Sequence, residues 1–174
     1  MPNIVPEKLT LFNVYTDGNR QLGVAEVTLP PLEFMTTEIK GAGLAGSMDS
    51  PGGGLFSSLT VTLNWRITTE DVFSLAEPRG HELDLYAEQL EWDAGSGEYV
   101  SHRFHIYLHA LTKKLDLGKF GTMETQDGSS EHEIYYLKID IDGTEQVEID
   151  KMNYVYRVQG TDYLAQTRRA IGMM

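Results

Sequence analysis

The amino-acid sequence predicts a mainly β fold, and three observations carry this prediction. Between residues 59 and 67 apolar and polar residues alternate without a break, which is typical of a strand with one buried face. Asp17-Gly18 and Asp142-Gly143 each separate two extended segments, as tight hairpin turns do. Residues 94–97, with the sequence AGSG, divide a third pair of strand-like segments. The apolar residues of the alternating pattern are Leu59, Val61, Leu63, Trp65 and Ile67.

The strands are expected in chain order, each from its own composition. Residues 11–16 run into the Asp17-Gly18 turn, and residues 22–28 follow as their partner strand. Prolines 30 and 31 interrupt pairing because proline has no N–H to donate, and an extended pattern resumes over 32–39. The later strands are expected over 55–68, 81–93, 98–112, 131–141 and 144–150.

Two short helices are expected beside the strands. Thr68 or Thr69 can cap the first, because acidic residues follow in its first turn and apolar residues come after them. Its packing residues are expected to be Val72, Phe73, Leu75 and Ala76. The second helix should start at Thr161 or Asp162 and end at Gly172.

The segment from residue 40 to residue 54, KGAGLAGSMDSPGGG, breaks the strand pattern. Seven of its 15 residues are glycine or proline, a composition that predicts a long flexible loop without a packed element. Loops of this kind are usually functional or disordered. We expect residues 1–174 to form one domain that carries this loop, because a domain typically takes about 100–200 residues.

Charge and composition exclude several classes of function. The chain has 26 acidic residues against 14 lysines and arginines, a net charge of −12, whereas gripping nucleic acid or anionic lipid requires cations. It has no cysteine, which excludes disulfides and thiolate sites, and no apolar run that approaches the ~18 residues of a membrane span. The first residues lack the apolar stretch of a signal peptide. We therefore expect a soluble, acidic domain made in the cytosol.

The acid is concentrated in one block. Residues 124–150 hold nine acidic residues against one base, Lys138. Two interpretations stay open: a solvated sheet face, or a surface whose field repels a polyanion.

Motifs for catalysis or cofactor binding are weak, so we expect no enzyme activity, cofactor or metal. Residues 41–46 match G-x-G-x-x-G, but a dinucleotide site also needs a following helix and an acid about 20 residues later. His102, His105 and His109 would share a face only in a helix. In the strand expected here, His102 points away from the other two, which stand ~13 Å apart at ~3.3 Å per residue.

Both ends of the chain carry distinctive sequence segments. Near the N-terminus NVYTDG at 13–18 is followed by VTLPPL at 27–32 and then by the glycine-rich segment. Near the C-terminus YYLKID at 135–140, the Asp142-Gly143 turn, VEID at 147–150 and VQGTD at 158–162 occur in that order, before Arg168. Together they resemble the major tail tube protein of contractile-tailed bacteriophages and look similar to the tubes of R-type bacteriocins. Residues 81–130 match only in their strand pattern.

The resemblance implies a fold, an assembly and partners. The expected fold is a two-sheet antiparallel β-sandwich or half-barrel with a short flanking helix and a C-terminal helix, which completes a larger barrel on oligomerisation. Six copies are expected to close into a ring, and the rings to stack into a hollow tube in the virion tail, assembled in the host cytoplasm. Implied partners are the tail sheath, baseplate, tail terminator and tape measure proteins, with DNA passing through the lumen. A ring or effector-carrier protein of a related injection machine, or a small β-barrel binding protein, remains the alternative.

Three sets of residues are candidates for these roles. The loop is expected to contact the next ring. One polar strand face is expected to line the lumen, while the acidic block could face either the lumen or the sheath. The inter-ring candidates are Lys40, Gly41, Gly43, Leu44, Met48, Asp49 and Pro51; the lumen candidates are Thr60, Thr62, Asn64, Arg66 and Thr68; and the acidic candidates, assigned to the sheath, are Glu131, Glu133, Asp140 and Glu145.

Overall fold

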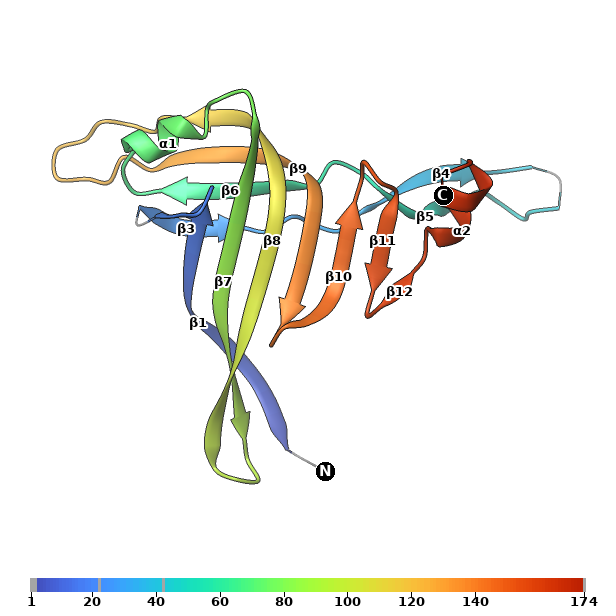
Figure 1. Ribbon diagram of the computed structural model, residues 1–174, viewed down its shortest axis with the longest axis horizontal. Coiled ribbons are helices and arrows are strands. Elements are labelled where there is room, and N and C mark those ends of the chain that lie inside the picture. Colours follow the sequence, from blue (N-terminus) through green and yellow to red (C-terminus); the bar gives the residue numbers. More distant parts are fainter. Residues whose placement is uncertain (1–2, 22, 42, 174) are drawn as a thin grey trace.

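The chain is mainly β, as predicted, and is arranged in two antiparallel sheets with two short helices (Figure 1). The structure, a computed structural model, describes residues 3–21, 23–41 and 43–173. Neither helix in this part of the chain is long and apolar enough to cross a membrane. The elements are β1 (Ile4–Thr16), β2 (Asn19–Gln21), β3 (Val24–Thr28), β4 (Phe34–Ile39), β5 (Met48–Phe56), β6 (Thr60–Trp65), α1 (Glu70–Ser74), β7 (Gly80–Asp93), β8 (Glu98–Asp116), β9 (Gly128–Ile141), β10 (Thr144–Asp150), β11 (Val155–Val158), β12 (Thr161–Asp162) and α2 (Ala165–Ala170).

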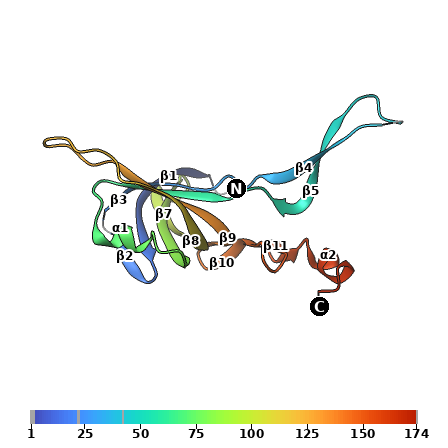
Figure 2. The same ribbon diagram turned by 90° about the horizontal axis from the view of Figure 1, so that it is seen from above.

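The main sheet is a run of antiparallel strands in the order β12-β11-β10-β9-β8-β7-β1-β2. It branches at β9, whose first half pairs with β6 and whose second half pairs with β10. β6 in turn pairs with β3. The second sheet contains only β4 and β5, which project from the right-hand end of the molecule in Figures 1 and 2.

Both predicted Asp-Gly turns are present, and each forms a tight turn between two antiparallel strands. Asp17 and Gly18 have φ angles of 48° and 81°, and Asp142 and Gly143 have φ angles of 50° and 79°. Two successive residues with positive φ give a turn whose twist matches the flanking strands. The partner expected for the first strand is wrong, however: β1 turns back into the short β2, whereas β3 pairs with β6. Leu22, where that partner strand was expected to begin, lies outside the described residues.

The core lies between the apolar face of the main sheet and the layer formed by β6 and α1. The alternation that predicted a strand is confirmed, because Leu59, Val61, Leu63 and Trp65 are all buried. The strand itself is shorter than the expected 55–68, since β6 ends at Trp65 and Ile67 is 59% exposed. Helix α1 contributes Val72, and Leu75 follows it into the core, but Phe73 faces solvent rather than the core as expected.

A chain of buried polar groups crosses this core. Trp65 Nε1–H donates to Ser130 Oγ at 2.9 Å, and that hydroxyl lies 2.9 Å from His132 Nε2. His132 Nδ1 lies 2.9 Å from Thr112 Oγ1, and the Thr112 hydroxyl donates to the carbonyl of Leu75. Every member is satisfied when His132 is neutral with its proton on Nδ1. Burial, together with the nearby His81, lowers the pKa of His132 to about 4, which agrees with the neutral form.

The glycine-rich segment is not a loop throughout. Residues 48–54 belong to β5, which pairs with β4 in the register Ile39↔Met48 and Glu38↔Asp49, so the expectation of an irregular segment over 40–54 is wrong. The described connecting residues are 40, 41 and 43–47, and Ala42 lies outside the described part. Gly54 has a φ of 117°, and a Cβ there would meet Leu164 at 3.0 Å. Glycine at this position therefore lets β5 pack closely against Leu164 and Tyr156.

Candidate functional site

Over β7, β8, β9 and β10 the main sheet has one mainly apolar and one mainly polar face. Residues directly opposite each other on paired strands share a face. Ile106, Leu108, Ile134 and Leu137 lie on the buried face. Because Ile134 and Leu137 are three residues apart, regular alternation would put them on opposite faces. A bulge at Tyr135 in β9 brings both to the buried face.

The lumen candidates and half of the acidic candidates lie on the same polar face. Thr60 is opposite Glu133, and Thr62 is opposite Glu131, across the β6–β9 pair. A side-chain hydrogen bond from Ser58 to Glu133 also connects the two strands. One set therefore cannot face the lumen while the other faces the sheath. Of the remaining lumen candidates, Asn64 is on this face opposite Ser129, whereas Arg66 and Thr68 lie beyond the end of β6.

The bulge brings the other acidic candidates to this face too. Asp140 is opposite His105 on β8 and opposite Glu145 on β10, so both carboxylates share the face of Glu131 and Glu133. Simple alternation would have put Asp140 on the other side from Glu133. Across the sheet, carboxylates on this face outnumber bases. On β7 to β11 the carboxylates are Glu82, Asp84, Glu88, Asp116, Glu131, Glu133, Asp140, Glu145, Glu148 and Asp150, and the bases are Arg103, Lys113, Lys114, Lys138 and Arg157.

Glu133 is the most firmly held of these acids. Its carboxylate accepts from Ser58 Oγ at 2.5 Å and lies 3.3 Å from both the Leu59 amide nitrogen and Lys151 Nζ. Burial raises the pKa of this carboxyl group, but the bonds from Ser58, Lys151 and Leu59 outweigh that effect and lower it. Glu145 lies 3.4 Å from Lys138 and 3.5 Å from Arg157. The face is thus acidic and largely ordered by its own ion pairs.

The histidines of β8 take the strand arrangement expected, with His105 and His109 on the polar face and His102 on the other. His105 Nε2 lies 2.8 Å from Asp84, and its ring stacks on Tyr86 with centroids 4.2 Å apart. His102 contacts Asp142 across the sheet, and this hydrogen bond raises the pKa of His102. Among the described residues, no group of three or more histidines and carboxylates is placed to hold a metal ion.

The β4–β5 hairpin contains the inter-ring candidates. Lys40, Gly41, Gly43 and Leu44 lie in or beside its tip, and Met48, Asp49 and Pro51 lie on β5; all are exposed. The G-x-G-x-x-G match falls on this tip and leads into a strand, which does not fit a dinucleotide site. Figure 2 shows the hairpin reaching away from the rest of the molecule.

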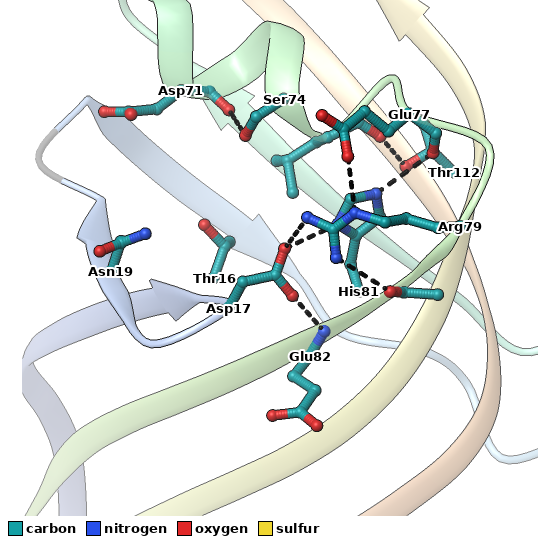
Figure 3. Close-up of polar contacts among 12 residues, drawn as sticks. Thr16, Asp17, Asn19, Asp71, Ser74, Glu77, Arg79, His81, Glu82 and Thr112 are labelled. Carbon is teal, nitrogen blue, oxygen red and sulfur yellow. Dashed lines mark hydrogen bonds and ion pairs between the residues drawn. The ribbon is translucent and has the colours of Figure 1, made fainter.

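Sequence reasoning missed a second polar cluster, at the start of β7 (Figure 3). His81 Nδ1–H donates to the Asp17 carboxylate at 2.9 Å, and Arg79 and the backbone N–H of Glu82 donate to the same group at 2.8 Å and 2.9 Å. Burial raises the pKa of Asp17, but these three bonds more than offset it and lower the pKa below its usual value. The cluster ties the β1–β2 turn to the segment after α1, which identifies it as structural.

A projecting segment between β8 and β9 was also missed. Phe120 is 98% and Met123 100% exposed, on the extended loop at the left-hand end of Figure 2. Its stem is ordered, because the Gln126 side chain accepts from the Thr68 amide at 2.9 Å and donates to the Leu117 carbonyl at 2.6 Å. Two apolar residues in a charged, glycine-rich stretch were the available signal. Fully exposed apolar groups on an ordered stem are typical of a protein contact.

Comparisons with known proteins agree with one another. A model of the family described as phage tail tube protein FII matches residues 6–172. The tail tube protein of Escherichia phage P2 is 29% identical over 175 residues, covering 97% of this chain and 99% of that protein. The major tail tube protein of Serratia phage KSP20 is 26% identical over 166 residues and covers 90% of each chain. One similar solved structure is a chain from the cryo-EM structure of the sheath/tube terminator of an extracellular contractile injection system, PVC. The match has a TM-score of 0.57 at 12% identity and covers 78% of this chain and 96% of that chain. It shows a shared fold.

Proposed function

Because the chain belongs to the phage tail tube protein FII family, we propose that six copies of it close into a ring and that these rings stack into the hollow tube of a contractile tail. The chain is a structural subunit of that tube. In this proposal residues 1–174 act as one domain with no enzymatic role. The tube stands in the virion tail after assembly in the host cytoplasm.

The observation that carries the proposal is the continuous polar face of the main sheet. Strands β7, β8, β9 and β10 run side by side and curve, with one face buried and the other covered by charged and polar side chains (Figure 1). We assign this polar face to the lumen. The assignment places Thr60, Thr62, Asn64, Glu131, Glu133, Asp140 and Glu145 on the channel wall together.

An acidic channel wall suits the passage of DNA, which is itself strongly negative. Cations on the wall would bind phosphates and retard DNA, and each added contact strengthens that binding. The excess of carboxylates instead repels the phosphate backbone of DNA. The sheath, baseplate and terminator proteins then contact other surfaces of the subunit. The sequence favours the sheath for the acidic candidates, but we propose the lumen for them instead, because they share a face with Thr60 and Thr62.

Ring closure explains the open edge of β1. Within the described residues, 4–12 pair with β7 on one side only, because β2 covers just residues 14–16. A long uncovered edge is a template for pairing with another chain, and Pro6 is the kind of residue that occurs at such edges. A neighbouring copy in the ring would cover it.

Contact between rings is assigned to the β4–β5 hairpin. Its candidates Lys40, Gly41, Gly43, Leu44, Met48, Asp49 and Pro51 are exposed on an arm that reaches beyond the main sheet. An isolated two-stranded hairpin is at best marginally stable in water. Docking on a second copy would stabilise it.

Electron microscopy of the purified chain tests the proposal. The expected result is rings with sixfold symmetry at low concentration and stacked tubes at high concentration or with a baseplate nucleus. A particle that stays monomeric at every concentration, and also with sheath and baseplate proteins added, would refute it.

A further inference from the structure

We propose that the tip of the β4–β5 hairpin docks in an apolar groove between β1, β3, β7 and β8 of a second copy in the neighbouring ring. This inference rests on the proposed function and deepens it, because it names the receiving surface. Two unpartnered apolar features of the same chain carry it.

The first feature is the apolar side of the hairpin tip. Ile39 and Met48 are directly opposite each other on β4 and β5, so they share a face. Both are exposed, as is Leu44 in the connecting turn. The hairpin therefore presents three large apolar side chains that are each about half exposed in the described part of the subunit.

The base of the hairpin is fixed, so the tip has a defined direction. Phe34 and Phe56 stack with centroids 4.8 Å apart, and both contact the ring of Tyr156 on β11. Gly54 lies so close to Leu164 and Tyr156 that a Cβ there would meet them at 3.0 Å and 3.2 Å. An arm held in this way loses little conformational freedom when its tip binds.

The second feature is a groove of about 240 Å³ at the opposite side of the main sheet. Leu85, Phe104 and Ile106 form its floor, where the apolar face of the sheet continues past the end of β3. Leu9, Phe12 and Leu29 line it and are exposed. The lining is almost wholly apolar, which favours an apolar occupant over a charged or polar ligand.

A second copy of this chain is the occupant that fits. β1 and β3 lie in the left half of the molecule, and the hairpin lies at the right-hand end in both views, so the two features face different neighbours (Figures 1 and 2). Contact between different patches on identical chains adds subunits head to tail, as stacking requires. Apolar character rather than charge favours this occupant, because Lys40, the only base between residues 34 and 56, lies 3.3 Å from Glu38 within the hairpin.

Cysteine cross-linking tests the contact directly, because the chain contains no cysteine of its own. Leu29→Cys and Met48→Cys subunits are mixed, assembled and exposed to a mild oxidant. The expected product is a disulfide-linked dimer in the mixture and none in either variant alone. The double variant should give a ladder of multimers, because each subunit both gives and receives a hairpin. Met48→Cys mixed with Met152→Cys, at an exposed turn outside the groove, is the matched control.

The outcomes separate this inference from the proposed function. Tubes that form normally with no more Leu29–Met48 dimer than the Met152 control would overturn the docking site and leave the tube intact. Failure of the wild-type chain to form rings or tubes would defeat the proposed function, and the docking inference with it.

A second pair of variants gives a readout without disulfides. Leu29→Glu should leave thermal unfolding unchanged, since Leu29 is exposed, but should abolish stacking. Leu111→Glu is its control, because Leu111 is 45% exposed against 44% for Leu29 and lies outside the groove. Stacking by the Leu29→Glu variant at the wild-type concentration would contradict the proposal.

Discussion

The side chain of His81 is completely buried, and its Nδ1 lies 2.9 Å from the carboxylate of Asp17 in the first hairpin turn. The same aspartate has two roles. Its backbone takes the positive φ that the turn needs, and its carboxylate accepts three hydrogen bonds from the segment after α1. The Asp17-Gly18 pair, which the sequence indicates only as a turn, therefore also joins β1 to β7.

Replacing Asp17 with asparagine separates these two roles. Asn-Gly suits the turn at least as well as Asp-Gly, so the change mainly removes the charge that His81 and Arg79 contact. We expect a loss of about 1–3 kcal/mol in the free energy of unfolding, measured by urea denaturation, because a buried donor loses a charged partner. Asp142→Asn is the matched control: Asp142 has the same turn geometry, but its partner His102 is not buried, and the loss should be smaller. Equal losses in the two variants would show that the turn, not the contact, matters.

The buried His132 makes the protein sensitive to mild acid. Its pKa is about 4 in the folded chain, against an ordinary value of 6.5, so the unfolded chain binds more protons between these limits. The contribution of His132 to stability should be constant above pH 6.5 and fall by about 3 kcal/mol as the pH drops to 4. The lowered pKa of Asp17 adds a further loss below pH 4. His132→Gln should remove the loss between pH 6.5 and 4 when unfolding is followed as a function of pH; an unchanged profile would contradict this assignment.

Trp65 is the largest side chain in the core and should be costly to truncate. Trp65→Ala is expected to lower the free energy of unfolding by about 3–5 kcal/mol, because it leaves a cavity and removes a donor to Ser130. Trp92→Ala, at the partly exposed end of the β7–β8 hairpin, should cost less. Since the chain has two tryptophans, the second variant also makes Trp65 the only tryptophan, so tryptophan fluorescence then reports on the core. A loss below about 1 kcal/mol for Trp65→Ala would mean that this face of β6 is not the buried one.

Local patterns predicted most of the strands, and long-range effects account for what they missed. The alternation around Leu63 and the two Asp-Gly turns depend on neighbouring residues, so β6, β9 and β10 could be expected from the sequence. Pairing of β3 with β6 joins segments about 40 residues apart and has no local signal. The bulge at Tyr135 reverses the alternation of β9 without any glycine to mark it, which is why Glu133 and Asp140 share a face that counting would separate. The polar residues of β6, β9 and β10 could thus be recognised from the sequence, but only the register shows that they share one face.

The length of the β4–β5 tip should control stacking without affecting the subunit. Deleting residues 41–46 leaves Lys40 and Ser47 as a two-residue connection between the paired Ile39 and Met48. Lys40→Asn with Ser47→Gly makes this connection an Asn-Gly turn, which suits a two-residue hairpin. We expect a melting temperature close to that of the wild type, because the base around Gly54 is intact, with rings that no longer elongate into tubes under the electron microscope. The two substitutions without the deletion are the control, and normal tubes from the shortened variant would contradict an inter-ring role.

Charge reversal on the polar sheet face tests whether that face lines the channel. Glu131→Lys with Glu145→Lys changes two acids that share this face and leaves the more firmly bonded Glu133 in place. If the face lines the lumen, the variant should form sheathed tails that eject DNA slowly, and its tubes should retain DNA fragments in a salt-dependent manner, since lysines bind phosphates. If the face contacts the sheath instead, bare tubes should form but sheath attachment should fail. Glu98→Lys with Glu70→Lys gives the same change in charge at exposed positions away from Glu131 and should behave as the wild type. Wild-type ejection together with wild-type sheath attachment in the Glu131/Glu145 variant would show that these acids serve only solubility.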